Sequence, residues 1–193
     1  LRQAVERRYR RLKTGEGQLV DTSLLEAGVT TTFWQSAICL ATGASPGAIG
    51  SAHPLSAPYQ ALQTADGWIN IGAANQANWQ RLVEVVELPE LAADARFTDN
   101  AARMQHLPAL IELLTARFRR RTTTEWLTRL EAAGVPAGPV LSIGEMLKDP
   151  QVLAREMVVD VTHSRLGKIK KLGTQVKFSA TPRGVRHGAP LLG

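Results

Sequence analysis

Three four-residue signals fix where helices begin along this chain. In each signal a Ser or Thr is followed three residues later by a Glu, and the two side chains can satisfy each other's backbone N–H groups. The pairs are Ser23 with Glu26, Thr122 with Glu125, and Ser142 with Glu145. They predict a long apolar helix over residues 24–40, a helix that ends at Gly134, and a short helix after Ser142.

Further signals divide the rest of the chain into helices and strands. Leu1 to Lys13 is helical in character and ends at Gly15. Asn75 is suited to cap a helix, and Asp99 or Asn100 begins another helical stretch. More helical spacing begins near Leu107. Apolar runs predict strands over 59–64, 68–72, 157–163, 168–172 and 175–179. The predicted fold class is mixed α/β, with more helix than strand.

The segment from Gly134 to Val140 contains two prolines and two glycines. This composition predicts a fixed, non-helical connector, because proline restricts the backbone and removes a donor. A turn that positions two subdomains is the favoured interpretation. A role in ligand binding is the alternative.

Charge and cysteine content limit the function classes. The net charge is +6, and basic residues gather near the first helix, at 117–121 and at 168–171. Solvated helix ends and a hairpin explain these clusters; anion steering and nucleic-acid binding are alternatives, but no nucleic-acid motif accompanies them. The single Cys39, expected to be a packed core thiol, is typical of a reducing cytoplasm. We recognise neither a signal peptide nor a membrane-length apolar run.

A search for chemistry singles out the segment from Gly47 to His53. Its small residues would allow backbone N–H groups to approach a ligand, and the histidine can donate a hydrogen bond. A plain flexible loop is the alternative interpretation. There is no phosphate-binding loop, and the four histidines are too far apart in sequence to suggest a metal site.

Several strings, taken in order, resemble the C-terminal half of the CoA-transferase family III, also called the CaiB/BaiF family. They are Arg11 to Ala27, Ala52 to Pro54, Pro58 to Ala61, Asp66 to Ile69, Leu88 to Leu91, Arg96 with Phe97, Gly134 to Val140, Asp149 to Gln151, and Ala189 to Gly193. The resemblance implies part of a large Rossmann-like domain with an inserted small α/β domain. Residues 1–45 and 143–193 would belong to the large domain and residues 46–142 to the small one.

The resemblance also implies the chemistry. Family members use an aspartate to attack an acyl-CoA thioester, and this residue would fall before Leu1, so no catalytic residue is expected in this chain. Substrate-binding residues are expected at Gly47, Gly50, Ser51 and His53, where the family has a glycine-rich loop, and at Asn75. The expected substrates are an acyl-CoA and a small carboxylic acid, possibly a dicarboxylate. Coenzyme A would be a substrate, and no cofactor is expected.

Alternatives to this interpretation remain. An α-methylacyl-CoA racemase would use a glutamate near the position of Asn75, and an amide cannot act as that base. A non-catalytic truncated chain that pairs with a partner is another alternative. The resemblance further implies a homodimer in the cytoplasm, with no nucleic-acid or membrane partner.

Overall fold

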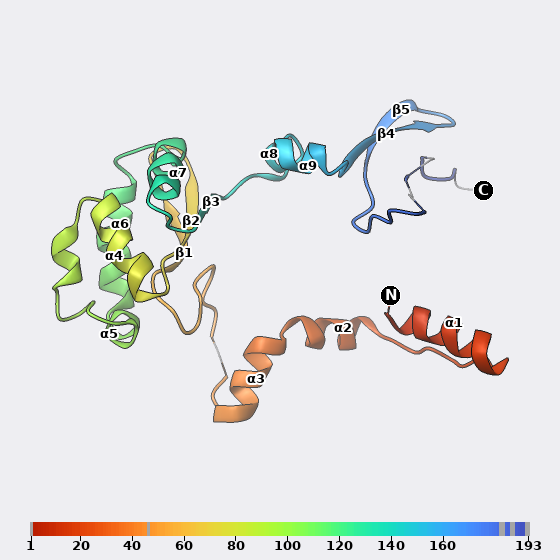
Figure 1. Ribbon diagram of the computed structural model, residues 1–193, viewed down its shortest axis with the longest axis horizontal. Coiled ribbons are helices and arrows are strands. Elements are labelled where there is room, and N and C mark those ends of the chain that lie inside the picture. Colours follow the sequence, from red (N-terminus) through yellow and green to blue (C-terminus); the bar gives the residue numbers. More distant parts are fainter. Residues whose placement is uncertain (1, 46, 182–183, 186–187, 192–193) are drawn as a thin grey trace. The chain divides into compact units, whose positions relative to one another are not determined.

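The structure, a computed structural model, describes residues 2–45, 47–181, 184–185 and 188–191. It contains two compact units, residues 1–50 and 51–193 (Figure 1). Its helices and small antiparallel sheets confirm the mixed α/β class. The division at residues 45 and 142 stays a prediction. Leu192 and Gly193, which end the last family string, lie outside the described residues, as does His187.

The first unit contains three helices: α1 (Arg2–Thr14), α2 (Leu24–Thr31) and α3 (Phe33–Thr42). The capping box of Ser23 and Glu26 is present as predicted. The single helix predicted over residues 24–40 is wrong, because the chain breaks at Thr32. The hydroxyl groups of Thr30, Thr31 and Thr32 each donate to a carbonyl of the preceding turn. Such bonds bend or interrupt helices.

Cys39 does not lie in a packed core, so that prediction is also wrong for the described structure. Its side chain is only partly buried, and neither α2 nor α3 has a buried residue. Two short helices that contact mainly each other cannot enclose a side chain.

The second unit begins with a three-stranded antiparallel sheet in the order β1 (Tyr59–Gln63), β2 (Trp68–Gly72) and β3 (Ala137–Pro139). The register pairs Tyr59 with Gly72 and Asn70 with Gly138. The two predicted strands are confirmed. No strand is predicted at β3 from the sequence, because proline disfavours strands. Proline is tolerated at the edge of a sheet, and β3 is an edge strand.

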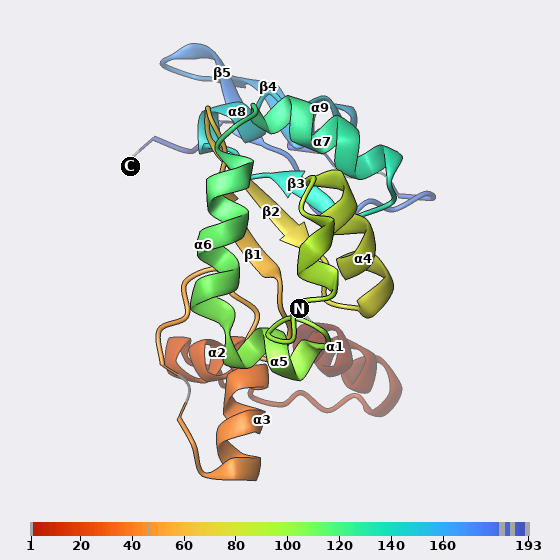
Figure 2. The same cartoon turned by 90° about the vertical axis from the view of Figure 1, so that its left-hand side faces the viewer.

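Helices pack on one face of this sheet (Figure 2). They are α4 (Gln76–Val85), α5 (Asn100–Gln105), α6 (Leu107–Phe118) and α7 (Thr123–Ala132), with a 3-10 turn η1 (Pro89–Ala92). The predicted caps Asn75, Asp99 and Thr122 are all confirmed. Gly134 follows α7 with a φ of +66°, the left-handed conformation that suits a glycine after a helix.

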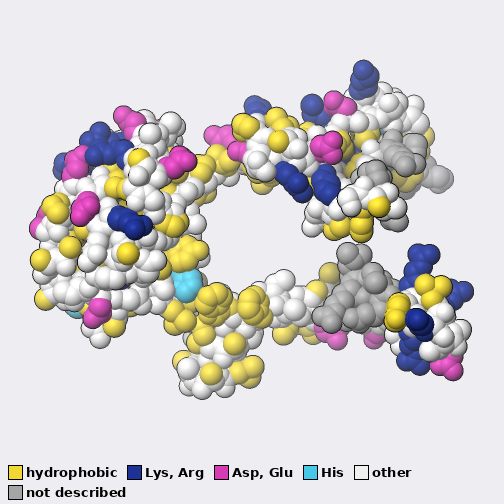
Figure 3. Space-filling model, viewed as in Figure 1, with side chains coloured by type: hydrophobic (Ala, Val, Ile, Leu, Met, Phe, Trp, Pro, Cys, Tyr) yellow, Lys and Arg dark blue, Asp and Glu magenta, His cyan; other side chains and the backbone are white. Residues whose placement is uncertain are grey.

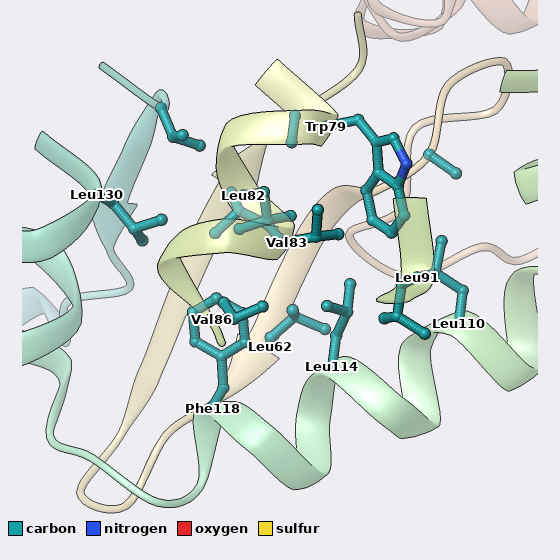
Figure 4. Packing of buried hydrophobic residues seen from close by; sticks show 14 of the residues in the cluster. Leu62, Trp79, Leu82, Val83, Val86, Leu91, Leu110, Leu114, Phe118 and Leu130 are labelled. Atoms are coloured by element: carbon teal, nitrogen blue, oxygen red, sulfur yellow. The ribbon is translucent and has the colours of Figure 1, made fainter. Parts of the chain in front are cut away.

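The core lies between the sheet and these helices (Figure 4). Leu62, Ile69 and Ile71 face it from the sheet, and the helices add Trp79, Leu82, Leu110, Leu114, Phe118, Trp126 and Leu130, all at most 1% exposed. Burial of a side chain of this size stabilises the fold by about 1.5–3 kcal/mol. The core therefore holds the strand ends and loops of this unit in fixed positions.

Two short helices and a hairpin follow the connector: α8 (Ile143–Met146), α9 (Pro150–Ala154), β4 (Val158–His163) and β5 (Gly167–Leu172). The helix after Ser142 and both strands of the hairpin were predicted to within a few residues. The strand predicted at 175–179 is wrong, since that segment has no ladder partner in the described structure. No described helix is long and apolar enough to cross a membrane.

Candidate functional site

The loop from Ser51 to Pro58 leads into β1 and contains two of the predicted binding residues. The Ser51 hydroxyl accepts a hydrogen bond from the Ala61 backbone N–H at 3.1 Å. The His53 N–H donates to the Tyr59 carbonyl at 2.9 Å. These contacts tie Ser51 and His53 back onto the first strand. The plain flexible loop over residues 47–53 stays an alternative prediction.

The His53 ring has a defined place. It stacks on the Tyr59 ring, with centroids 5.2 Å apart and planes within 5° of parallel. Its Nδ1 accepts a hydrogen bond from the Leu55 backbone N–H at 3.1 Å. In the neutral ring the proton must then be on Nε2, which becomes the donor. The stacking and the Leu55 hydrogen bond thus fix the orientation of the His53 ring.

Asn75 caps α4. Its Oδ1 accepts from the Asn78 N–H at 2.8 Å, so its amide NH₂ is the group that could reach an anion. In the antiparallel register Tyr59 opposes Gly72, and the Ala73 N–H donates to the Pro58 carbonyl at 3.0 Å. The loop before β1 and the residues after β2 therefore lie at the same end of the sheet.

Gly47 and Gly50 belong to the first unit. A Cβ atom on either glycine would meet open space, and Gly50 has a φ of +60°. The positive φ at Gly50 favours glycine, because other residues rarely adopt this backbone conformation. A side chain at this position would not collide with neighbouring atoms. Binding roles for these two glycines stay predictions, as do those of Ser51, His53 and Asn75.

Two residues of α5 hold the loop, and sequence reasoning identified neither as part of the site. The Asn100 amide donates to the Leu55 carbonyl at 2.9 Å and accepts from the Ala57 N–H at 3.0 Å. The Arg103 Nε donates to the Ala57 carbonyl at 2.7 Å. The only sequence signal here was a helix start near Asp99.

Arg103 is 1% exposed. Its Nη1 donates to Gln76 Oε1 at 3.0 Å and to the Phe97 carbonyl at 3.1 Å, and its guanidinium lies over the Trp79 ring, 5.1 Å from the centroid. Burial lowers the pKa of Arg103, and the charge of Asp99 opposes this shift. A buried cation surrounded by acceptors fixes the segments that supply them.

The middle basic cluster is organised around one carboxylate. Glu87, in the left-handed conformation with a φ of 59°, accepts from Arg117, from Arg121 at 3.1 Å and from Arg129 at 2.8 Å. The Arg129 hydrogen bond and the charges of the three arginines lower the pKa of Glu87. The prediction of solvated helix ends is therefore wrong for Arg117, whose side chain is only 17% exposed.

Two surface depressions adjoin the predicted connector. One, of about 510 Å³, is lined by Leu127, Glu131 and residues 134–137. The other, of about 320 Å³, is lined by Tyr59, residues 70–72 and residues 136–139. Neither lining gathers several polar side chains, so we assign no chemistry to them.

The first unit exposes many apolar side chains along α2 and α3 (Figure 3). Leu24 is 93% exposed, Phe33 is 69% exposed and Leu40 is 88% exposed. Exposed apolar surface of this kind is typical of a face that other protein covers.

Comparisons with known proteins give one consistent result. The profile described as CoA-transferase family III matches residues 4–193. A mouse (Mus musculus) succinyl-CoA:glutarate CoA-transferase is 33% identical over 183 residues, which are 95% of this chain and 42% of that protein. An acetyl-CoA:oxalate CoA-transferase from Acetobacter aceti is 35% identical over 187 residues, covering 95% of this chain and 46% of that protein.

Comparison with solved structures leads to the same family. The crystal structure of a CaiB/BaiF family protein from Brucella suis matches with a TM-score of 0.81 and 34% identity, over 95% of this chain and 47% of that chain. The chain thus spans less than half the length of the relatives it matches. Since the family profile extends along almost the whole sequence, the chain belongs to CoA-transferase family III.

Proposed function

We propose that the protein containing this chain moves CoA from an acyl-CoA to a free carboxylic acid. The observation that carries the proposal is the match along 95% of the chain to proteins named as CoA-transferases, with glutarate and oxalate in their names. The fixed loop from Ser51 to Pro58, with hydrogen-bond donors on Ser51 and His53, supplies groups suited to carboxylate and thioester oxygens.

The proposed chemistry is covalent carboxylate catalysis by an aspartate outside this chain. Its carboxylate attacks the thioester carbonyl, the C–S bond breaks, and CoA leaves as a thiolate. The thiolate then attacks the aspartyl carbonyl of the mixed anhydride and releases the donor acid. The acceptor carboxylate attacks the carbonyl of the aspartyl-CoA thioester, the C–S bond breaks, and a second mixed anhydride and CoA thiolate form. The thiolate attacks the acceptor carbonyl of this anhydride, which gives the new acyl-CoA and frees the aspartate carboxylate.

In this scheme the residues of this chain position the substrate oxygens and keep water away from the reaction intermediates. We assign hydrogen bonds to substrate oxygens to the Ser51 hydroxyl, the His53 Nε2–H and the Asn75 amide. The backbone at Gly47 and Gly50 would allow close approach of the substrate. Water exclusion matters because both the anhydride and the thioester intermediates hydrolyse. A dicarboxylate acceptor is our preferred substrate class.

The first experiment incubates the intact protein with succinyl-CoA and glutarate and follows both CoA esters by mass spectrometry. We expect glutaryl-CoA to form, and hydroxylamine to trap an aspartyl intermediate as a hydroxamate on a single peptide. The His53→Ala variant should lower kcat/KM by between about tenfold and a hundredfold through lost substrate positioning.

A second arm tests the racemase alternative. In D₂O without any acceptor acid, a racemase would exchange the α-proton of a 2-methylacyl-CoA, whereas a transferase would not. Proton exchange without acceptor-dependent CoA transfer would overturn the proposal. We also expect a homodimer, which sedimentation velocity would test.

A further inference from the structure

We propose that Asn100 and Arg103, on α5, are positioning residues that hold the loop from Ser51 to Pro58 in the geometry needed for CoA transfer. This inference rests on the proposed function. It assigns to α5 a role in the reaction although neither side chain need touch the substrate.

The Asn100 side chain binds the loop through two hydrogen bonds. Its amide oxygen accepts from the Ala57 N–H and its NH₂ donates to the Leu55 carbonyl. One amide thus bridges two backbone groups that are two residues apart, as a neighbouring strand would. The bond vectors of a planar amide are fixed, so this contact sets the path of the loop between His53 and β1.

Arg103 extends the contact to the second candidate segment. From one buried guanidinium it donates to the Ala57 carbonyl in the loop and to Gln76 at the start of α4. Gln76 directly follows Asn75, and its own amide NH₂ donates to the Thr98 carbonyl at 2.8 Å. The two candidate substrate-binding segments are therefore linked through the side chains of Arg103 and Gln76.

The energetics favour a fixed arrangement over a mobile one. Removing a partner from a buried charged donor costs more than a neutral hydrogen bond contributes, because the charge is left unsatisfied. Loop opening at Ala57 would break bonds to both Asn100 and Arg103 at once. The loop is thus preorganised before substrate binds, which lowers the entropy cost of ordering it in the transition state.

The test uses Asn100→Ala in the intact protein, with Asp99→Ala as the matched control. Asp99 caps the same helix through the Ala102 N–H at 2.8 Å, so its loss weakens α5 without removing a bond to the loop. Asn100→Asp is a partial rescue, because it keeps the acceptor for Ala57 and loses the donor to Leu55. Arg103→Lys tests the second link.

Two readouts are measured: the ratio of acyl-CoA hydrolysis to CoA transfer, and hydrogen exchange of the Ala57 amide. We expect Asn100→Ala to speed exchange and to raise the hydrolysis ratio by between about tenfold and a hundredfold. Asn100→Asp should be intermediate. Asp99→Ala weakens the helix cap but keeps both bonds to the loop, so it should change each readout much less than Asn100→Ala does.

Equal effects of Asn100→Ala and Asp99→Ala would overturn the inference, since helix stability would explain both. Faster exchange with an unchanged hydrolysis ratio would also overturn it. If the wild-type protein transfers no CoA, the proposed function fails, and the catalytic part of this inference fails with it. Unchanged exchange in Asn100→Ala would instead overturn the structural link itself.

Discussion

Asp66 and Thr123 are 57 residues apart in the chain, yet the Asp66 carboxylate accepts a hydrogen bond from the Thr123 backbone N–H at 2.7 Å. Asp66 lies in the turn between β1 and β2, and Thr123 is the first residue of α7. The same oxygen also accepts from the hydroxyl groups of Thr123 and Thr64. One turn residue therefore joins the sheet to the start of a helix.

Replacing Asp66 with Ala should lower Tm by several degrees near neutral pH. Hydrogen bonds from the Thr123 backbone and side chain lower the pKa of Asp66 below its ordinary value of 3.8. A carboxyl whose folded pKa is depressed stabilises the fold above its unfolded pKa and loses this effect as pH falls through the folded pKa. The Tm difference should thus shrink as the pH is lowered below 3.8. Thermal unfolding across a pH series measures it.

Asp160→Ala is the control for Asp66. Among the described residues, Asp160 forms an exposed ion pair with Lys170 at 3.4 Å, and such a pair contributes little to stability. A Tm difference for Asp66→Ala that stays constant at low pH would contradict the proposed role of the charge.

Glu87→Gln should destabilise the protein, and more strongly at low salt. The change leaves Arg117, Arg121 and Arg129 without their shared carboxylate, and their mutual repulsion is screened by salt. Urea unfolding at low and high ionic strength measures the effect. Glu84→Gln makes the same chemical change at an exposed site of α4, and equal losses in both variants would rule out the cluster as the cause.

Asn75→Asp separates the cap from a substrate role. Asp and Asn are about equally good N-caps, so the stability should be unchanged. If the Asn75 amide donates to a substrate carboxylate, the added negative charge should instead raise KM by about tenfold or more. Thermal unfolding and steady-state kinetics on the same samples decide this. An unchanged KM would leave Asn75 as a cap alone.

Leu114→Ala should reduce the free energy of unfolding by about 3 kcal/mol, because it opens a cavity in the core. Leu114 is 0% exposed, while its neighbour Leu113 is 38% exposed. Leu113→Ala, the control, should cost about 1 kcal/mol or less. Chemical denaturation measures the free energy of unfolding of both variants. Similar decreases for Leu114→Ala and Leu113→Ala would mean that α6 presents a different face to the sheet.

Gly173→Ala should destabilise the β4–β5 hairpin by about 1–3 kcal/mol, the usual cost of overpacking. A Cβ atom at this position would collide with the Glu156 carbonyl oxygen, so the backbone must move. Hydrogen exchange of the hairpin amides reports the change. Gly144→Ala is the control: a Cβ there meets no atom within 4 Å, so the change should be neutral or stabilising. Unchanged hydrogen-exchange protection of the hairpin in Gly173→Ala would show that Gly173 does not lie close to the Glu156 carbonyl.

Those features of this protein that depend on neighbours within about four residues could be predicted from the sequence. The capping boxes at Ser23, Thr122 and Ser142 all occur as predicted, because cap and partner are three residues apart. The hairpin around Asp66 follows from turn chemistry of equally short range. The family resemblance could be recognised for a different reason. It depends on short strings and their order in the linear sequence, which do not depend on the fold.

Tertiary structure alone decided the rest. The edge strand β3 exists because its backbone completes the ladder of β2, although Pro139 within it and Pro136 before it argue against a strand. The Glu87 cluster joins residues 30 to 42 positions apart, and Arg103 reaches Ala57 across 46 positions. Nothing in the local sequence indicates such partners. They are set by the packing of α4, α5, α6 and α7 on the sheet, which brings the buried Arg103 cation to the carbonyl and amide oxygens that accept its hydrogen bonds.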